Sequence, residues 1–209
     1  KHYVERQPKA VQNSFKRLGA TLKNIRNEKK IFLFLVAFFF YIDGVYTIID
    51  MATAYGTALG LDSTGLLLAL LVTQLVAFPF AIIFGRLSKC YDVRTLITIC
   101  IAAYFGIAVF AIFLKAQWQF WIMAILVGMF QGGIQALSRS YFTKIIPAEK
   151  SGEYFGLMDI CGKGASFLGT TVISLIAQFT GKVNIGVGAI SLFFVCGMIV
   201  FKMATAEAE

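Results

Sequence analysis

The chain alternates between long apolar stretches and short polar interruptions. About 20 apolar residues in a helix, at a rise of about 1.5 Å each, cross the hydrocarbon core of a bilayer. The pattern therefore predicts an all-α polytopic membrane protein with six transmembrane helices, over residues 31–58, 65–87, 94–114, 118–142, 152–179 and 184–203. The connections are short, so we expect successive spans to form antiparallel hairpins.

The first 30 residues follow a different pattern. A narrow apolar stripe with four- and three-residue spacing runs between Lys and Arg side chains, and consists of Val11, Phe15, Leu18, Leu22 and Ile25. This stripe predicts an amphipathic helix over 11–30, within a basic cytoplasmic linker over 1–30. Such a helix can lie on an anionic leaflet or pack on the protein itself, and the periodicity leaves both open. The membrane bundle then covers 31–203, and 204–209 form a cytoplasmic tail.

Composition supports the membrane class. Hydrophobic residues make up 58% of the chain and charged residues 14%, with a mean hydropathy of +0.77. Soluble domains average about 45–50% apolar and about 25% charged residues. The composition excludes a disordered chain, a collagen and a nucleic-acid-binding module, and it argues against an ordinary soluble enzyme.

The positions of the positive charges predict an orientation. Sixteen of the 19 Lys and Arg residues lie on one side of the expected spans, Lys115 and Lys182 lie on the other, and Lys163 lies inside a span. Loops rich in Lys and Arg stay in the cytoplasm, so both termini are expected there. Because the basic segment directly precedes the apolar run at Ile31, its expected partner is the lipid bilayer rather than nucleic acid.

Residues for enzyme chemistry are scarce. The single histidine is His2, and the four cysteines are far apart without a C-x-x-C pair. The stretch Gly162-Lys163-Gly164 lacks the spacing of a phosphate-binding loop. We therefore expect no catalytic residues, no metal site and no cofactor.

Polar residues interrupt the first apolar span. Asp43 and Asp50 are seven residues apart, which places them on one helix face about 10 Å from each other, with Tyr46 and Thr47 between them. A carboxylate is costly in the membrane, so both are candidates for proton or ion coupling. The pattern favours an aqueous cavity over a hydrogen-bonded helix seam for Asp43, and leaves both open for Asp50.

The fifth span carries Asp159 and Lys163 at i and i+4. This spacing allows an ion pair on one helix face. The pair either makes the helix insertable or acts as a switch that opens when a solute or proton arrives, and a buried pair alone does not decide between these roles.

Neutral polar groups add to this set. Gln131, Gln135 and Arg139 follow one another at four-residue spacing in the fourth span, and Gln74 lies in the second. They can bind a polar solute or join helices by hydrogen bonds. Small residues also repeat every four positions, as in Gly128, Gly132, Ala136 and Ser140, which allows close helix contact.

The connection over residues 85–94 resembles the short cytoplasmic loop motif of the major facilitator superfamily. Gly85 and Arg94 match it, whereas Lys89, Cys90 and Asp92 depart from it. The resemblance makes Gly85, Arg86 and Arg94, together with Arg139, candidates for a cytoplasmic gate.

Residues 41–45, 51–56, 131–140 and 153–163 resemble motifs of the vacuolar-effluxer-like branch of that superfamily. The resemblance implies the C-terminal six-helix half of a twelve-helix transporter, built of two three-helix repeats. The other half would be supplied by the same polypeptide, of which this chain would be a piece, or by a second copy. The fungal members are linked to amino-acid release from the vacuole. We expect the bacterial cell membrane as the location, with the vacuolar membrane as the alternative.

These expectations combine into a hypothesis of secondary transport of a small polar solute, such as an amino acid, with a proton as the candidate coupling ion. Asp43 would carry the proton, Asp159 and Lys163 would respond to it, and Gln74, Gln131 and Gln135 would contact the solute. A six-helix scaffold that binds a partner, and a half-transporter acting as a homodimer, are the alternatives.

Overall fold

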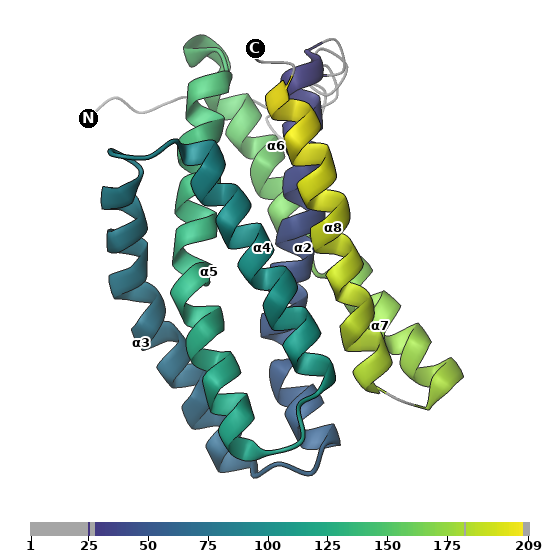
Figure 1. Ribbon diagram of the computed structural model, residues 1–209. Helices are drawn as coiled ribbons and strands as arrows, with labels where there is room; N and C mark the ends of the chain where they lie inside the picture. Colours follow the sequence, from purple (N-terminus) through teal and green to yellow (C-terminus); the bar gives the residue numbers. More distant parts are fainter. Residues whose placement is uncertain (1–24, 26–27, 182, 207–209) are drawn as a thin grey trace, which may run out of the picture.

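The computed structural model describes residues 25, 28–181 and 183–206, and this part of the chain is helical without a strand (Figure 1). The elements are α2 (Lys29–Ala58), α3 (Ser63–Leu87), α4 (Val93–Ile112), α5 (Gln117–Ile145), the 3-10 turn η1 (Ala148–Lys150), α6 (Ser151–Gly164), α7 (Phe167–Thr180) and α8 (Val183–Ala206). Six helical stretches are long and apolar enough to cross a membrane, which confirms the predicted fold class. Most of the predicted amphipathic helix over 11–30 lies outside the described residues.

Local residue chemistry sets the helix ends. The Asp62 carboxylate accepts the backbone N–H of Gly65 at 2.7 Å and caps α3, and Asp92 accepts that of Arg94 at 3.1 Å and caps α4. Gly60 and Gly181 follow α2 and α7 with φ of 75° and 67°, a conformation that glycine adopts without a steric penalty.

The fifth span is not one helix. The prediction of a continuous helix over 152–179 is wrong at residues 165 and 166, where α6 ends and α7 begins. Ser166 has a left-handed φ of 77°, and is the only non-glycine with a positive φ in the described ranges. A break within a membrane leaves backbone N–H groups that need acceptors. Asp43 of α2 supplies the acceptor here, as described below.

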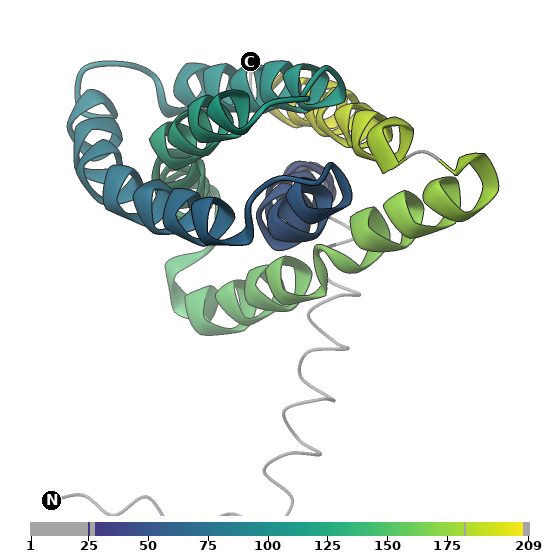
Figure 2. The same ribbon diagram turned by 90° about the horizontal axis from the view of Figure 1, so that it is seen from below.

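Helix α2 lies in the middle of the bundle, with α4 and α8 on one side and α6 and α7 on the other (Figure 2). Successive membrane spans run antiparallel as expected, but most of them do not pack mainly on the next span: α3 packs mainly along α5, and α2 mainly along α8. Glycines permit the first contact. A Cβ added to Gly128 would lie 2.6 Å from the carbonyl oxygen of Thr73, and one added to Gly132 would lie 2.8 Å from that of Ala77.

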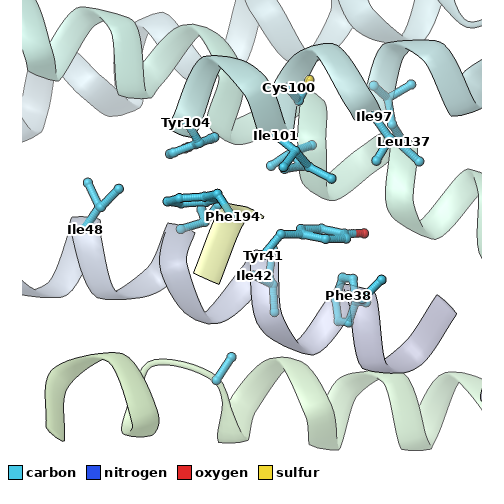
Figure 3. Close-up of a cluster of buried hydrophobic side chains, with 14 of the residues drawn as sticks. Phe38, Tyr41, Ile42, Ile48, Ile97, Cys100, Ile101, Tyr104, Leu137 and Phe194 are labelled. Atoms are coloured by element: carbon cyan, nitrogen blue, oxygen red, sulfur yellow. The ribbon is translucent and has the colours of Figure 1, made fainter. Parts of the chain in front are cut away.

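The interior is rich in aromatic side chains. Figure 3 shows Tyr104 of α4 stacked on Phe194 of α8, with ring centroids 5.6 Å apart. The Tyr41 hydroxyl of α2 lies 2.7 Å from that of Ser138 on α5, so this polar contact joins two helices inside the core. Large apolar side chains such as Phe78 and Phe179 are exposed, by 73% and 87%, which suits a surface that faces lipid tails.

One end of the bundle, here termed the basic end, carries the start of α2, the α3–α4 and α5–α6 connections and the end of α8 (Figure 1). Its described cations are Lys29, Lys30, Arg86, Lys89, Arg94, Lys144, Lys150 and Lys202. Lys115 lies in the α4–α5 connection at the opposite end. The structure thus gathers at one end the loops whose charges predict a cytoplasmic location.

Candidate functional site

A cavity of about 340 Å³ opens between α2, α5, α6 and the α6–α7 break. We term it the charged cavity. Its lining consists of Phe38, Ile42, Tyr46, Asp50, Gln135, Arg139, Met158, Asp159, Gly162, Lys163, Ala165 and Ser166. It contains two carboxylates, two cations, a phenol and an amide within an otherwise apolar bundle.

Helical spacing places these side chains together. The α2 residues that line the cavity are each four positions apart, as are Gln135 and Arg139 on α5 and Asp159 and Lys163 on α6. Residues at i and i+4 lie on the same helix face, one turn apart. Each helix therefore presents one stripe to the cavity, and the structure brings together Tyr46, Asp50, Gln135, Arg139, Asp159 and Lys163.

An ion pair joins two of these stripes. The guanidinium Nη2 of Arg139 lies 2.7 Å from the Oδ1 of Asp159, and the two side chains are 59% and 44% exposed. The predicted pairing of Asp159 with Lys163 is wrong: within the described ranges, Lys163 has no carboxylate within ion-pair distance. Arg139 reaches Asp159 from the facing helix with a planar guanidinium suited to a carboxylate. Lys163 instead lies exposed in the last turn of α6, where the helix dipole favours a cation.

Asp43 has a different environment from the one expected. It does not line the charged cavity but is fully buried, and its carboxylate accepts the backbone N–H groups of Ser166 and of Gly169, the latter at 3.1 Å. The first of these donors belongs to the cavity wall. Asp43 thus lies at the N-terminus of α7, where the helix dipole and unpaired N–H groups favour a negative charge. Asp43 therefore lies in a hydrogen-bonded seam between helices, whereas the sequence pattern favoured an aqueous cavity for it. Asp50 lines the charged cavity.

The remaining candidate solute contacts are dispersed. Thr47 is buried and packs directly against Gly169. A side chain added at Gly169 would collide with the side chain of Thr47. Gln74 of α3 is exposed and lines a different, small apolar pocket between α2, α3 and α5. Gln131, one turn before Gln135, has a buried Oε1 without a hydrogen-bond partner in the part of the chain that the structure describes. None of the three lines the charged cavity.

The candidate gate residues also separate. Gly85 and Arg86 lie in the last turn of α3, and Arg94 opens α4 with its Nε 2.8 Å from the Oδ2 of Asp92. Burial is the largest single influence on the pKa of Asp92 and raises it, but the hydrogen bonds from the backbone and guanidinium of Arg94, together with the nearby positive charges, outweigh burial. The pKa of Asp92 therefore lies below its ordinary value. Only Arg139 of this set reaches the charged cavity.

Sequence reasoning missed the wall formed by Gly162, Ala165 and Ser166. A signal for it was present, because small and polar residues interrupt the apolar pattern from Gly162 to Ser166. These residues could be recognised as a helix break only together with Asp43, which accepts the backbone N–H of Ser166 and is more than a hundred residues away in the chain.

Comparison with known proteins agrees with this architecture. The family model described as "Vacuole effluxer Atg22 like" matches residues 2–208. The MFS-type transporter YxiO of Bacillus subtilis (strain 168) is 46% identical over 209 residues, which are 100% of this chain and 49% of that protein. Autophagy-related protein 22 of Candida glabrata is 28% identical over 95% of this chain and 39% of its own length. Autophagy-related protein 22-2 of Aspergillus niger is 25% identical over 94% and 36%.

The chain therefore spans about half the length of the bacterial relative and less than half of the fungal ones. The family match covers nearly all of its residues and coincides with six membrane-length helical stretches. On this evidence the chain belongs to the Atg22-like vacuole effluxer family, whose relatives include an MFS-type transporter.

Proposed function

We propose that this chain forms the C-terminal six-helix half of a secondary transporter that moves a small polar solute, such as an amino acid, by alternating access. The charged cavity carries the proposal. It presents carboxylates and cations from three helices to one open space, and such an arrangement complements a solute that bears both signs of charge. Intramembrane ionisable residues that face a cavity are typical of solute and proton pathways.

The proposed mechanism uses the Arg139–Asp159 pair as a contact that the solute replaces. A solute carboxylate would take the guanidinium and a solute ammonium the Asp159 carboxylate, while Tyr46 and Gln135 would complete its hydrogen bonds. The two side chains are partly exposed, so opening the pair costs less than it would in a dry core. The proposed N-terminal half would close the cavity from the other side.

The experiment is solute flux into liposomes that contain the full-length gene product. We expect exchange of labelled amino acids in the wild type, and at least a tenfold loss in Arg139→Gln and Asp159→Asn. Lys150→Gln is the matched control, because Lys150 is an exposed cation in the α5–α6 connection, outside the cavity. Wild-type flux in both cavity variants would contradict the proposed site. No flux of any tested solute would favour a membrane scaffold.

Proton coupling through Asp43 stays a proposal with its own test. Asp43→Asn keeps an acceptor for the α7 N–H groups but cannot lose a proton. If Asp43 carries the proton, this variant loses the dependence of flux on the pH gradient while retaining solute exchange. Intact proton-linked flux in Asp43→Asn would assign the residue to helix capping alone.

The source of the other half is a separate question. Intact mass and the coding sequence upstream of Lys1 distinguish a twelve-helix polypeptide from a half-length protein. In the second case two copies would have to assemble, and the oligomeric state in lipid would then separate a dimeric transporter from a scaffold.

A further inference from the structure

Two hollows lie end to end along the seam between α4 and α8. The one nearer the basic end measures about 500 Å³ and includes Arg94, Thr95 and Lys202 in its lining. The other measures about 350 Å³ and is lined by apolar side chains, among them Ala102 and Val195. Lys202 belongs to both linings, so the two hollows adjoin at that side chain.

We propose that this seam binds one anionic phospholipid of the leaflet at the basic end, with its phosphate near Lys202 and Arg94 and one acyl chain along the apolar hollow. Basic pockets between transmembrane helices are known to hold anionic lipid headgroups. The site differs from the charged cavity in its helices, its residues and its ligand, and its exposure to lipid rests on the proposed function, in which a second half closes the charged cavity.

The charges at the mouth favour an anion. Lys202 is exposed and lines both hollows. A lysine can lay its four-carbon stem along an apolar surface while its ammonium remains at the polar end. The negative charge of Asp92 disfavours an anion at this position, but Asp92 forms an ion pair with Arg94. The positive charge of Lys144 on α5 also interacts with the Asp92 carboxylate. Among the described residues that line the hollow nearer the basic end, two cations, Arg94 and Lys202, accompany one carboxylate, Asp92, so the lining carries a net positive charge.

The position of the seam selects a lipid as the occupant. Figure 2 shows α4 and α8 on the opposite side of α2 from α6, which contributes to the charged cavity. A second transporter half that closes the cavity therefore leaves this seam facing the bilayer. The apolar hollow is bordered by exposed Phe105, Val195 and Ile199, whose natural neighbours in a membrane are acyl chains. The polar part of the seam lies at the basic end, and the rest of its lining is mostly apolar. This arrangement suits one lipid, with its headgroup at the basic end and its acyl chain along the apolar hollow.

The test is lipid retention by the purified full-length protein, measured by native mass spectrometry after exposure to equal amounts of phosphatidylglycerol and phosphatidylcholine with identical acyl chains. We expect the wild type to retain phosphatidylglycerol preferentially. Lys202→Gln should lower that retention about fivefold, since one basic residue near the surface contributes about 1 kcal/mol. Lys202→Arg should keep the preference. Lys150→Gln, at the same end but outside the seam, should not change it.

A second pair of variants tests the acyl-chain part of the site. Ala102→Trp places a bulky ring in the apolar hollow and should reduce retention of phosphatidylglycerol. Leu192→Trp, on the exposed surface of α8 outside both hollows, should not. Thermal unfolding confirms that each variant is folded.

Three outcomes would overturn the proposal. Equal retention of the two lipids by the wild type would remove the anionic preference. An equal loss in Lys202→Gln and Lys150→Gln would show general attraction to the basic end. Displacement of the lipid by inorganic phosphate would show an anion site that does not need the acyl chain.

Discussion

Asp43 is the only fully buried carboxylate among the described residues, and it accepts the backbone N–H groups of Ser166 and Gly169 at the start of α7. Replacing it with Ala leaves those donors without an acceptor, which costs about 1–3 kcal/mol for a buried group. We expect Asp43→Ala to lower the free energy of unfolding by about 3 kcal/mol, and Asp43→Asn by less than half of that, because an amide oxygen still accepts. Thermal and denaturant unfolding in detergent measure both.

Asp62→Ala is the matched control for Asp43. Asp62 caps α3 in the same way but is exposed, so its loss should cost only about 1 kcal/mol. If Asp43→Ala is no more destabilising than Asp62→Ala, burial does not add to the capping energy and the α6–α7 break has another support.

Asp92 supplies a pH-dependent contact at the basic end. Its pKa in the folded protein lies below its ordinary value of 3.8, so the charge stabilises the folded state fully above that value. The contribution is lost as the pH falls through the lowered pKa. We expect Asp92→Asn to be less stable than the wild type at pH 7, and the difference to shrink below about pH 4. Unfolding midpoints measured from pH 7 to pH 3 test this, and a difference independent of pH would exclude a role of the charge.

The sequence identified half of the residues that line the charged cavity, but not the contacts between them. An ionisable side chain in an apolar span stands out because burying it is costly, so Asp50, Arg139 and Asp159 could be found from their positions alone. The ion pair between Arg139 and Asp159 could not, because it depends on how α5 and α6 face each other. The same reason explains the misplacement of Asp43, since only the position of α7 shows that its carboxylate caps a helix.

At the scale of elements, glycine controls the contact between α3 and α5. We expect Gly128→Ala and Gly132→Ala each to destabilise the bundle by about 1–3 kcal/mol, because the new Cβ would meet backbone carbonyls that cannot move independently. Gly106→Ala on α4 is the control, since its Cβ would meet no atom within 4 Å. That substitution should be neutral or slightly stabilising through helix propensity. Equal effects at all three positions would contradict the close-contact argument.

The sequence predicted the six membrane-spanning stretches, but it did not predict that the fifth is interrupted between α6 and α7. The apolar pattern gave all six spans because hydropathy and length suffice for that inference. The break at Ser166 escaped it because apolar residues resume at Phe167, so the average hydropathy of the span stays high. Only the backbone donors and their acceptor on α2 distinguish two short helices from one long helix.

At the scale of the molecule, the sequence did not reveal which helices are neighbours. Hairpin connections suggested contact between successive helices, whereas α3 lies along α5 and α2 occupies the centre of the bundle (Figure 2). An apolar stripe can pack against any other apolar stripe, so helix order requires shape information such as the glycines of α5.

The orientation of the whole bundle yields the last prediction. Cys90 is exposed in the α3–α4 connection at the basic end, and Lys115 lies in the α4–α5 connection at the opposite end. The charge difference between the ends predicts that Cys90 faces the cytoplasm. In a full-length protein that retains only this cysteine, a membrane-impermeant maleimide should label inside-out vesicles and leave right-side-out vesicles unlabelled. Lys115→Cys in a cysteine-free background should show the reverse pattern. If Cys90 is labelled from the outside instead, the basic end faces away from the cytoplasm, and the proposed lipid would belong to the outer leaflet.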